Sequence, residues 1–160
     1  MDELITIVAR VGIIGAGLIG GTFFAFSTFI MAALKRLPDT EGIRAMQQIN
    51  RTVYTPWFMI PFMGTTLLSI GVIVLGALNT DQDWWIAMLS AGGFYAFGVF
   101  LVTGVHNVPW NKKLDRVRAE DEASVEVWQL YLKVWTRWNH VRTASSVISV
   151  VLFAYVLLHT

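Results

Sequence analysis

Two short stretches of the chain each place a histidine beside an asparagine, close to other groups that could handle a proton. These groups are His106, Asn107 and Asn111 in "VHNVPWN", and Asn139, His140 and Arg142 in "RWNHVRT". A neutral imidazole can take a proton from an acidic carbon or a phenol, and amide or guanidinium groups can stabilise the resulting anion. An electron-rich carbanion can then react with O₂ without a cofactor. The residues permit this acid–base chemistry without establishing it.

Each of these residues also has a simpler explanation. Either histidine could bond a carbonyl at a helix end, Arg142 could reach lipid phosphates, and Asn107 could satisfy the carbonyls that end a helix before Pro109. Two histidines could bind a metal, but most catalytic sites need a third protein ligand. We therefore predict no metal or other cofactor, with His106 and His140 as the ligands if a metal is bound. The sequence leaves metal and haem open.

The composition indicates where these groups must be positioned. The chain is 55% hydrophobic and only 14% charged, with a mean hydropathy of +0.57, whereas about a quarter of a soluble domain is charged. So few charges could not cover the surface of a soluble protein. The net charge of +1 gives no case for a nucleic-acid partner, and the lack of cysteine excludes disulfides and thiolate metal sites.

Four runs without Lys, Arg, Asp or Glu dominate the sequence, at 11–34, 53–80, 84–111 and 143–160. A helix needs about 20 apolar residues to cross a membrane. We predict one all-α domain over residues 1–160, a bundle of four transmembrane helices with helical cytoplasmic connections. The expected spans are about 11–34, 55–78, 84–106 and 141–159.

Basic residues are distributed unevenly over the predicted connections. The connections between spans 1 and 2 and between spans 3 and 4 hold eleven of the 12 Lys and Arg residues, and only Arg10 lies on the other side. Lys and Arg are retained in the cytoplasm during insertion. We therefore expect the long connections in the cytoplasm and both termini on the opposite side.

Residues 15–20 of the first span, "GAGLIG", have the G-x-G-x-x-G spacing of a dinucleotide-binding turn. Such a turn needs an amphipathic helix after it, but the following "TFFAFSTFIMAAL" has no polar face. Small residues recur at every fourth position, at Gly12, Ala16 and Gly20 and at Gly17 and Gly21. In lipid this spacing lets helices approach closely. We predict a groove for a neighbouring helix, from this chain or a second copy, and no nucleotide binding.

The long connections are predicted to contain helices. One begins at the N-cap candidate Thr40 and has a face formed by Ile43, Met46, Ile49 and Asn50. The other has helical spacing in its second half, at Val127, Leu130, Val134 and Trp138. That half could lie on the membrane surface or continue into the last span.

Polar side chains gather at the cytoplasmic ends of the spans, where four helix ends converge. Asn, His and Arg are costly at membrane depth and usually face the bundle interior or a wet cavity. We predict a polar pocket there, roofed by aromatic side chains. Its expected catalytic residues are His140, Arg142, Asn139 and Asn107. Its expected substrate contacts are Asn50, Asn111, His106, Tyr54, Thr28 and Trp110.

Four blocks of the sequence resemble the bacterial DUF1772 family, described as anthrone-oxygenase-like integral membrane proteins. They are "GGTFFAFSTFIMAAL", "EGIRAMQQINRTVYTPWFM", "HNVPWNKKL" and "YLKVWTRWNHVRTASS". The resemblance implies a four-helix protein of the bacterial inner membrane and, for some relatives, oxygenation of an anthrone to an anthraquinone. It nominates the polar residues Asn50, Asn107, Asn111, Asn139, His140 and Arg142.

Together the residues and the resemblance lead us to expect a small membrane oxygenase. Its substrate would be hydrophobic and aromatic and would enter from the bilayer lipid, with His140 as the base or a metal ligand. The alternative is a non-enzymatic membrane protein that binds lipid or quinone, or a subunit that packs against a partner or a second copy through the span 1 glycines. A transporter is disfavoured because the midplane of the spans lacks charge.

Overall fold

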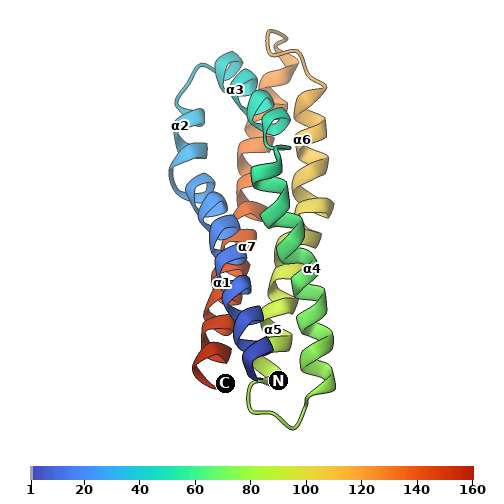
Figure 1. The fold of residues 1–160 in the computed structure, drawn as a ribbon. Coiled ribbons are helices and arrows are strands. Elements are labelled where there is room, and N and C mark those ends of the chain that lie inside the picture. Colours follow the sequence, from blue (N-terminus) through green and yellow to red (C-terminus); the bar gives the residue numbers. More distant parts are fainter. Residues whose placement is uncertain (1) are drawn as a thin grey trace.

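The computed structural model describes residues 2–160, and every regular element in that range is helical. Four long helical segments lie side by side, and one shorter helix crosses one end of the bundle (Figure 1). The elements are α1 (Asp2–Ala25), η1 (Phe26–Ile30), α2 (Met31–Lys35), α3 (Asp39–Thr52), α4 (Pro56–Leu78), α5 (Trp85–Tyr95), η2 (Ala96–Leu101), η3 (Thr103–Asn107), α6 (Val108–Asp115) and α7 (Ala123–Leu158), where η marks a π-helix. The predicted all-α bundle is confirmed.

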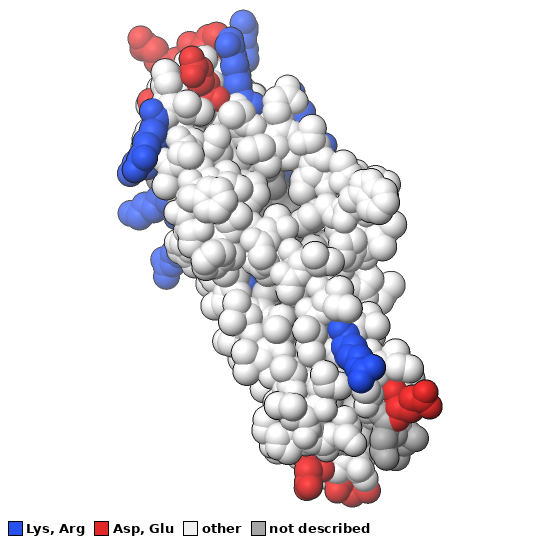
Figure 2. Space-filling view, turned by 60° about the vertical axis from the view of Figure 1, so that its left-hand side comes forward, with Lys and Arg blue, Asp and Glu red and all other residues white. Residues whose placement is uncertain are grey.

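Four continuous helical segments are long and apolar enough to cross a membrane: Glu3–Lys35, Pro56–Leu78, Trp85–Asp115 and Ala123–Leu158. The chain is therefore a multi-pass membrane protein. Three of these segments are longer than the uncharged runs that predict them, because the helices continue into charged sequence. Figure 2 shows the charged residues gathered toward the two ends of the molecule, with an uncharged belt between them. α1 begins at the same end of the bundle at which α7 ends (Figure 1).

The connections at the other end are helical, with three differences from the expected details. α3 buries Ile43, Met46 and Asn50, but it begins at Asp39, with Pro38 rather than Thr40 at the N-cap position. α7 is continuous from Ala123, so the second half of the last connection runs straight into span 4. Pro109 does not end span 3. It lies in α6, which continues span 3 directly from η3, so the helical segment runs through the proline to Asp115.

α7 turns a different face inward from the one that aliphatic spacing indicates. Its buried residues include Trp128, Tyr131, Trp135 and Asn139, whereas Leu130 is 41% exposed. The rings of Trp128, Tyr131 and Trp135 stack on one another, and the buried amide of Asn139 finds its hydrogen-bond partners inside the bundle. The aromatic and polar stripe therefore faces the bundle.

The small residues of α1 set its distance from α7, which packs against both α1 and α5. A Cβ on Gly12 would lie 2.7 Å from the ring of Phe153, and one on Gly20 would lie 2.8 Å from Ser146 Cβ. The predicted packing groove is thus confirmed on this face, within one chain. Gly17 and Gly21 have nothing within 4 Å, so no helix of the same chain covers them. Contact with a second copy there stays a prediction.

The two glycine faces give a matched pair of variants. Gly12→Ala should lower the free energy of unfolding by about 1–3 kcal/mol, because overpacking forces Phe153 to move. Gly17→Ala should leave it unchanged or raise it by up to about 1 kcal/mol, because alanine is the better helix former. Unfolding in mixed micelles measures both. Equal destabilisation by the two variants would contradict this account of the α1–α7 contact.

Candidate functional site

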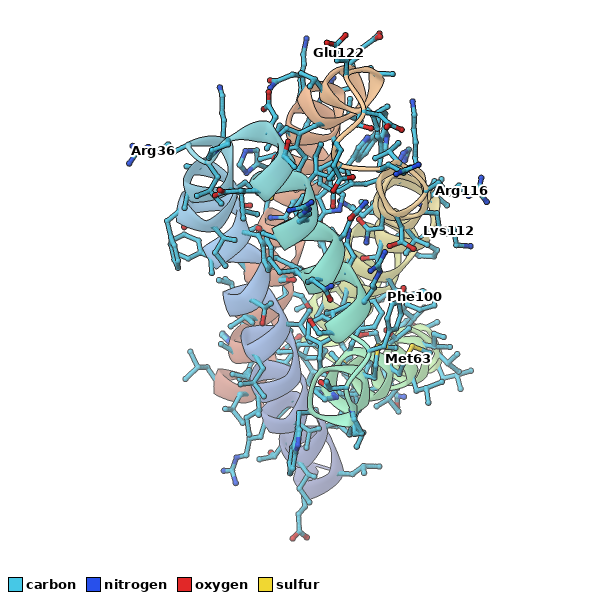
Figure 3. The ribbon with its side chains drawn as sticks, turned by 90° about the horizontal axis from the view of Figure 1, so that it is seen from above. Arg36, Met63, Phe100, Lys112, Arg116 and Glu122 are labelled. Atoms are coloured by element: carbon cyan, nitrogen blue, oxygen red, sulfur yellow. The ribbon has the colours of Figure 1, made fainter. Side chains whose placement is uncertain are left out.

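An internal cavity of about 390 Å³ lies beneath α3, toward the end of the bundle that holds the long connections. Its wall is mostly apolar and includes Phe23, Phe26, Met46, Phe58, Phe62 and Trp135. Met63 and Phe100 also line it, and they are 39% and 38% exposed. Figure 3 shows these two residues near each other at the side of the bundle. The cavity therefore opens sideways, between α4 and the π-helical part of span 3.

Arg142 is the only residue lining the cavity that carries a full charge at neutral pH, and its side chain is 4% exposed. Its Nη1 donates to Thr103 Oγ1 (3.2 Å) and its Nη2 to Asn139 Oδ1 (2.7 Å). The guanidinium lies 4.0 Å from the ring centre of Phe23 and 5.0 Å from that of Trp135. Such cation–π contacts replace part of the lost hydration. Among residues 2–160 no carboxylate pairs with this guanidinium.

The depth of Arg142 follows from its position on α7. It lies sixteen positions before the last residue of the helix, Leu158, a rise of about 24 Å at 1.5 Å per residue. The hydrocarbon layer is about 30 Å thick. Arg142 therefore lies within that layer, near the edge that faces the long connections, where an unpaired cation is expensive and usually functional.

Asn139 fixes the guanidinium from the side opposite the cavity. It is fully buried, and its Nδ2 donates to the carbonyl of Phe23 and to Ser27 Oγ, both at 2.7 Å. Using the amide hydrogens in this way leaves Oδ1 to accept from Arg142. Two bonds to span 1, one to α1 and one to η1, thus hold the acceptor in place, and Arg142 keeps one orientation toward the cavity.

A second polar chain crosses the cavity wall. Tyr131 is fully buried, and its hydroxyl donates to Asn111 Oδ1 (2.9 Å) and accepts a long bond from Asn50 Nδ2 (3.4 Å). Both asparagines line the cavity. The Nδ2 of Asn107 donates to the carbonyl of Trp135 (3.1 Å), so Asn107 does not satisfy carbonyls at the end of span 3 as its simpler explanation required.

Departures from regular α-helix surround the cavity. Phe26 comes from η1, Phe100 from η2, and Thr103 with Gly104 from η3. A π-helical turn is wider than an α-helical one, and π-bulges occur frequently at functional sites. These segments widen spans 1 and 3 at the level of the cavity. No cue for the π-helical turns was found in the sequence.

α3 forms the roof and is bonded to the end of α6 and to the connection between α6 and α7. The Nε2 of Gln47 donates to the carbonyl of Leu114 (2.9 Å). Arg44 pairs with Glu120, and Arg51 pairs with Asp115 at 2.7 Å. The hydrogen bond from Arg44 is the main reason that the pKa of the Glu120 carboxyl lies below its ordinary value. The polar contacts hold the roof over the cavity.

The structure brings part of the predicted site together. Arg142, Asn50, Asn111 and Tyr54 line the cavity, Asn139 holds Arg142, and Asn107 is buried beside Trp135. The other predicted residues, His106, His140, Thr28 and Trp110, do not line it. Thr28 instead donates to the carbonyl of Phe24, and Trp110 lies under Lys113.

The two histidines are not brought together. His106 is half-buried and stacks on Trp138 with ring centres 3.5 Å apart. His140 lies two residues after Trp138, which corresponds to a rotation of roughly 200° around the helix. It therefore lies on the opposite side of α7 and is exposed. Among residues 2–160 no group of three His, Cys, Asp or Glu side chains is placed to hold a metal. The placement of His140 gives no support to its expected role as the base.

The residues that the sequence reasoning missed are Tyr131, Thr103 and the apolar lining from α4. Tyr131 carried one usable signal, since Trp128, Tyr131 and Trp135 recur at helical spacing and stack in the structure with ring centres 5.7 and 5.8 Å apart. Thr103 had none, because one hydroxyl in an apolar span usually bonds its own helix.

A sequence profile of the family described as anthrone oxygenase matches residues 51–152. The chain belongs to this family. The matched range contains Tyr54, Asn107, Asn111, Asn139 and Arg142, together with spans 2 and 3 and span 4 as far as residue 152. Asn50 lies one residue before it. No curated protein and no solved structure matches the chain.

The hydrogen bonds of Asn139 can be tested by their effect on stability. Asn139→Ala should lower the free energy of unfolding by about 2 kcal/mol, because it removes three buried hydrogen bonds and strips the guanidinium of its closest acceptor. The neighbouring His140→Ala is the control and should change it by less than about 0.5 kcal/mol, because His140 is exposed. A larger effect of His140→Ala than of Asn139→Ala would overturn the assigned orientation of α7.

Proposed function

We propose that this protein is a membrane oxygenase that acts on a hydrophobic aromatic substrate of the anthrone type, bound in the cavity beneath α3. One observation carries the proposal: a buried guanidinium, with no carboxylate partner among residues 2–160, lines a mostly apolar cavity. An apolar ring system fits the wall, and an anion formed on that ring system is the partner that Arg142 lacks. The family described as anthrone oxygenase supports the same substrate class.

The proposed reaction balances with O₂ as the only oxidant. Loss of one proton from the methylene carbon of the anthrone gives an enolate whose negative charge lies largely on oxygen, next to Arg142. The carbanion form adds O₂, and protonation of the peroxide anion gives a hydroperoxide. Removal of the second C–H proton with cleavage of the O–O bond then forms the carbonyl and releases water. The methylene group is oxidised by four electrons, and O₂ accepts all four.

In this scheme the chain acts by electrostatics and exclusion of water. Arg142 stabilises the enolate, because a preorganised cation in an apolar site favours the charged form far more than it does in water. Asn139 and Thr103 position the guanidinium. No histidine lines the cavity, so water at the end of the cavity beside Tyr54, which is exposed, accepts the proton and later returns one to the peroxide anion.

The cavity also fits a substrate that arrives from lipid. Its volume of about 390 Å³ lies within the roughly 300–1,000 Å³ of small-molecule sites. Its opening at Met63 and Phe100 faces sideways rather than toward either charged end. A hydrophobic polycyclic molecule dissolved in the bilayer can enter without crossing water.

We further propose that the protein lies in the bacterial inner membrane with α3 and the α6–α7 connection in the cytoplasm. The distribution of Lys and Arg supports this orientation. Because the chain has no cysteine, single cysteines can report it.

Asp81→Cys should react in intact spheroplasts with a membrane-impermeant maleimide, and Glu122→Cys should react only after the membrane is opened. Asp81 lies in the short α4–α5 connection and Glu122 in the α6–α7 connection. The reverse labelling pattern would show that the long connections face outward.

The purified protein, given an anthrone and O₂, should produce the absorption of the quinone. Arg142→Gln should lower kcat/KM by about 10²–10³, the usual effect of removing a donor that stabilises an oxyanion. His140→Ala should stay within about twofold of wild type, because His140 is exposed and does not line the cavity.

Three results would count against the proposal. Wild-type turnover in a folded Arg142→Gln variant would remove the assigned role of Arg142. Loss of activity in a folded His140→Ala variant would show that His140 is needed for the proton transfer after all. Tight binding of a quinone without turnover would favour a non-enzymatic binding protein.

A further inference from the structure

A second hollow, of about 530 Å³, lies in the groove between α7 and the end of span 1 formed by η1 and α2. Its lining residues include Ser27, Thr28, Ala32, Lys35, Leu132 and Lys133. It shares no residue with the cavity that holds Arg142. The groove is therefore a separate feature that the proposed oxygenase reaction does not use.

The two lysines of the groove lie at nearly the same level. The contact between Ser27 and Asn139 fixes the register of the antiparallel helices. Lys35 lies eight residues after Ser27 on span 1, and Tyr131 lies eight residues before Asn139 on α7, so these two residues are at the same level. Lys133 is two residues from Tyr131 and therefore lies within one helical turn of the level of Lys35. Lys35 is also the first charged residue after the uncharged run 11–34. This level is the boundary between the apolar belt and the charged end.

The charges of both lysines are left without an anion. In the part of the chain that the structure describes, the ion pairs are Arg44–Glu120 and Arg51–Asp115, and neither involves the groove. The nearest identified acidic contact is at the upper rim, where Gln129 Nε2 donates to Asp39 Oδ1 (3.1 Å). Two ammonium groups from two spans thus border one groove with room for an anion between them.

Hydroxyl residues line the lower half of the groove, and among them Thr136 Oγ1 is buried without a hydrogen-bond partner in the described residues, whereas the others are bonded within the protein. Thr28 Oγ1 donates to the carbonyl of Phe24 (2.7 Å). Ser27 Oγ accepts from Asn139 and bonds Thr143 Oγ1 (2.9 Å). With these hydroxyls satisfied, the lower groove presents mainly apolar surface from residues such as Ala32. The groove is cationic at the membrane boundary and apolar below it.

We propose that this groove binds the phosphate of an anionic phospholipid, with Lys35 and Lys133 on the phosphate and an acyl chain in the apolar lower half. Basic pockets between transmembrane helices bind anionic headgroups in this way. A free phosphate ion has the same chemistry at the lysines, but it leaves the apolar half of the groove without a ligand. The combination of the two halves favours the lipid.

The test compares lipids retained by the full-length protein after transfer from nanodiscs into mild detergent, measured by native mass spectrometry. The wild type should retain phosphatidylglycerol in preference to phosphatidylcholine. Lys35→Gln with Lys133→Gln should weaken that retention about thirtyfold, at roughly fivefold for each lysine near an anionic lipid. Both lysines are at the surface, so the fold should survive, and thermal unfolding checks it.

The control removes the same charge from the same end of the bundle, with Lys112→Gln and Arg116→Gln. Figure 3 shows these two residues on the other side from Arg36, which adjoins Lys35. The control should retain the lipid as the wild type does. Equal loss of phosphatidylglycerol from both double variants would show that retention depends only on overall charge and would contradict the proposed site. Full retention by the variant without Lys35 and Lys133 would also contradict it.

A competition experiment separates the two sources of phosphate. Inorganic phosphate at millimolar concentration should leave the bound phosphatidylglycerol in place, because it cannot replace the acyl contacts. Displacement of the lipid by inorganic phosphate, with protection of Lys35 and Lys133 from acetylation by phosphate alone, would assign the groove to a soluble anion and overturn the lipid proposal.

Discussion

The buried guanidinium of Arg142 is the group on which the rest of the site depends. A cation in an apolar bundle is stable only if polar groups and aromatic faces replace the water around it. Thr103 comes from span 3, Phe23 from span 1, and Asn139 with Trp135 from α7. Because three spans supply these contacts, the charge is accommodated only in the assembled bundle. The fold and the site therefore form together.

Some of the buried polar atoms in and near this cation have no hydrogen-bond partner. In the described residues, Arg142 Nε and Asn107 Oδ1 are buried without a protein partner, which is unusual because most buried polar atoms are paired. Arg142 also faces the cavity without a carboxylate. A bundle optimised only for stability would pair this charge or replace it. The unpaired cation, the wide π-helical turns and the sideways opening together are features of a binding site.

Sequence patterns predicted the bundle and the polar end of the spans well. They failed at the rotation of α7, where aliphatic spacing selected Leu130 and the structure buries Tyr131 next to it. A shift of one residue also distinguishes Asn139, which is buried, from His140, which was expected in the pocket but is exposed. Leu130 lies 28 positions from Leu158, about 42 Å along α7, so this part of the helix extends beyond the hydrocarbon layer of about 30 Å. There the large side chains of Trp128, Tyr131 and Trp135 bury more apolar area than an aliphatic side chain, and they take the inward face instead of Leu130.

The sequence by itself determined the number of spans, the helical connections and the residue types available for chemistry. Each follows from a local quantity, such as the length of an uncharged run compared with the thickness of the membrane. Only the tertiary structure decided that Arg142, Asn50, Asn111 and Tyr54 share one cavity while both histidines lie outside it. That outcome depends on how far each helix is rotated and how closely α1 approaches α7. Both are set by contacts between residues far apart in the chain, such as Gly12 with Phe153.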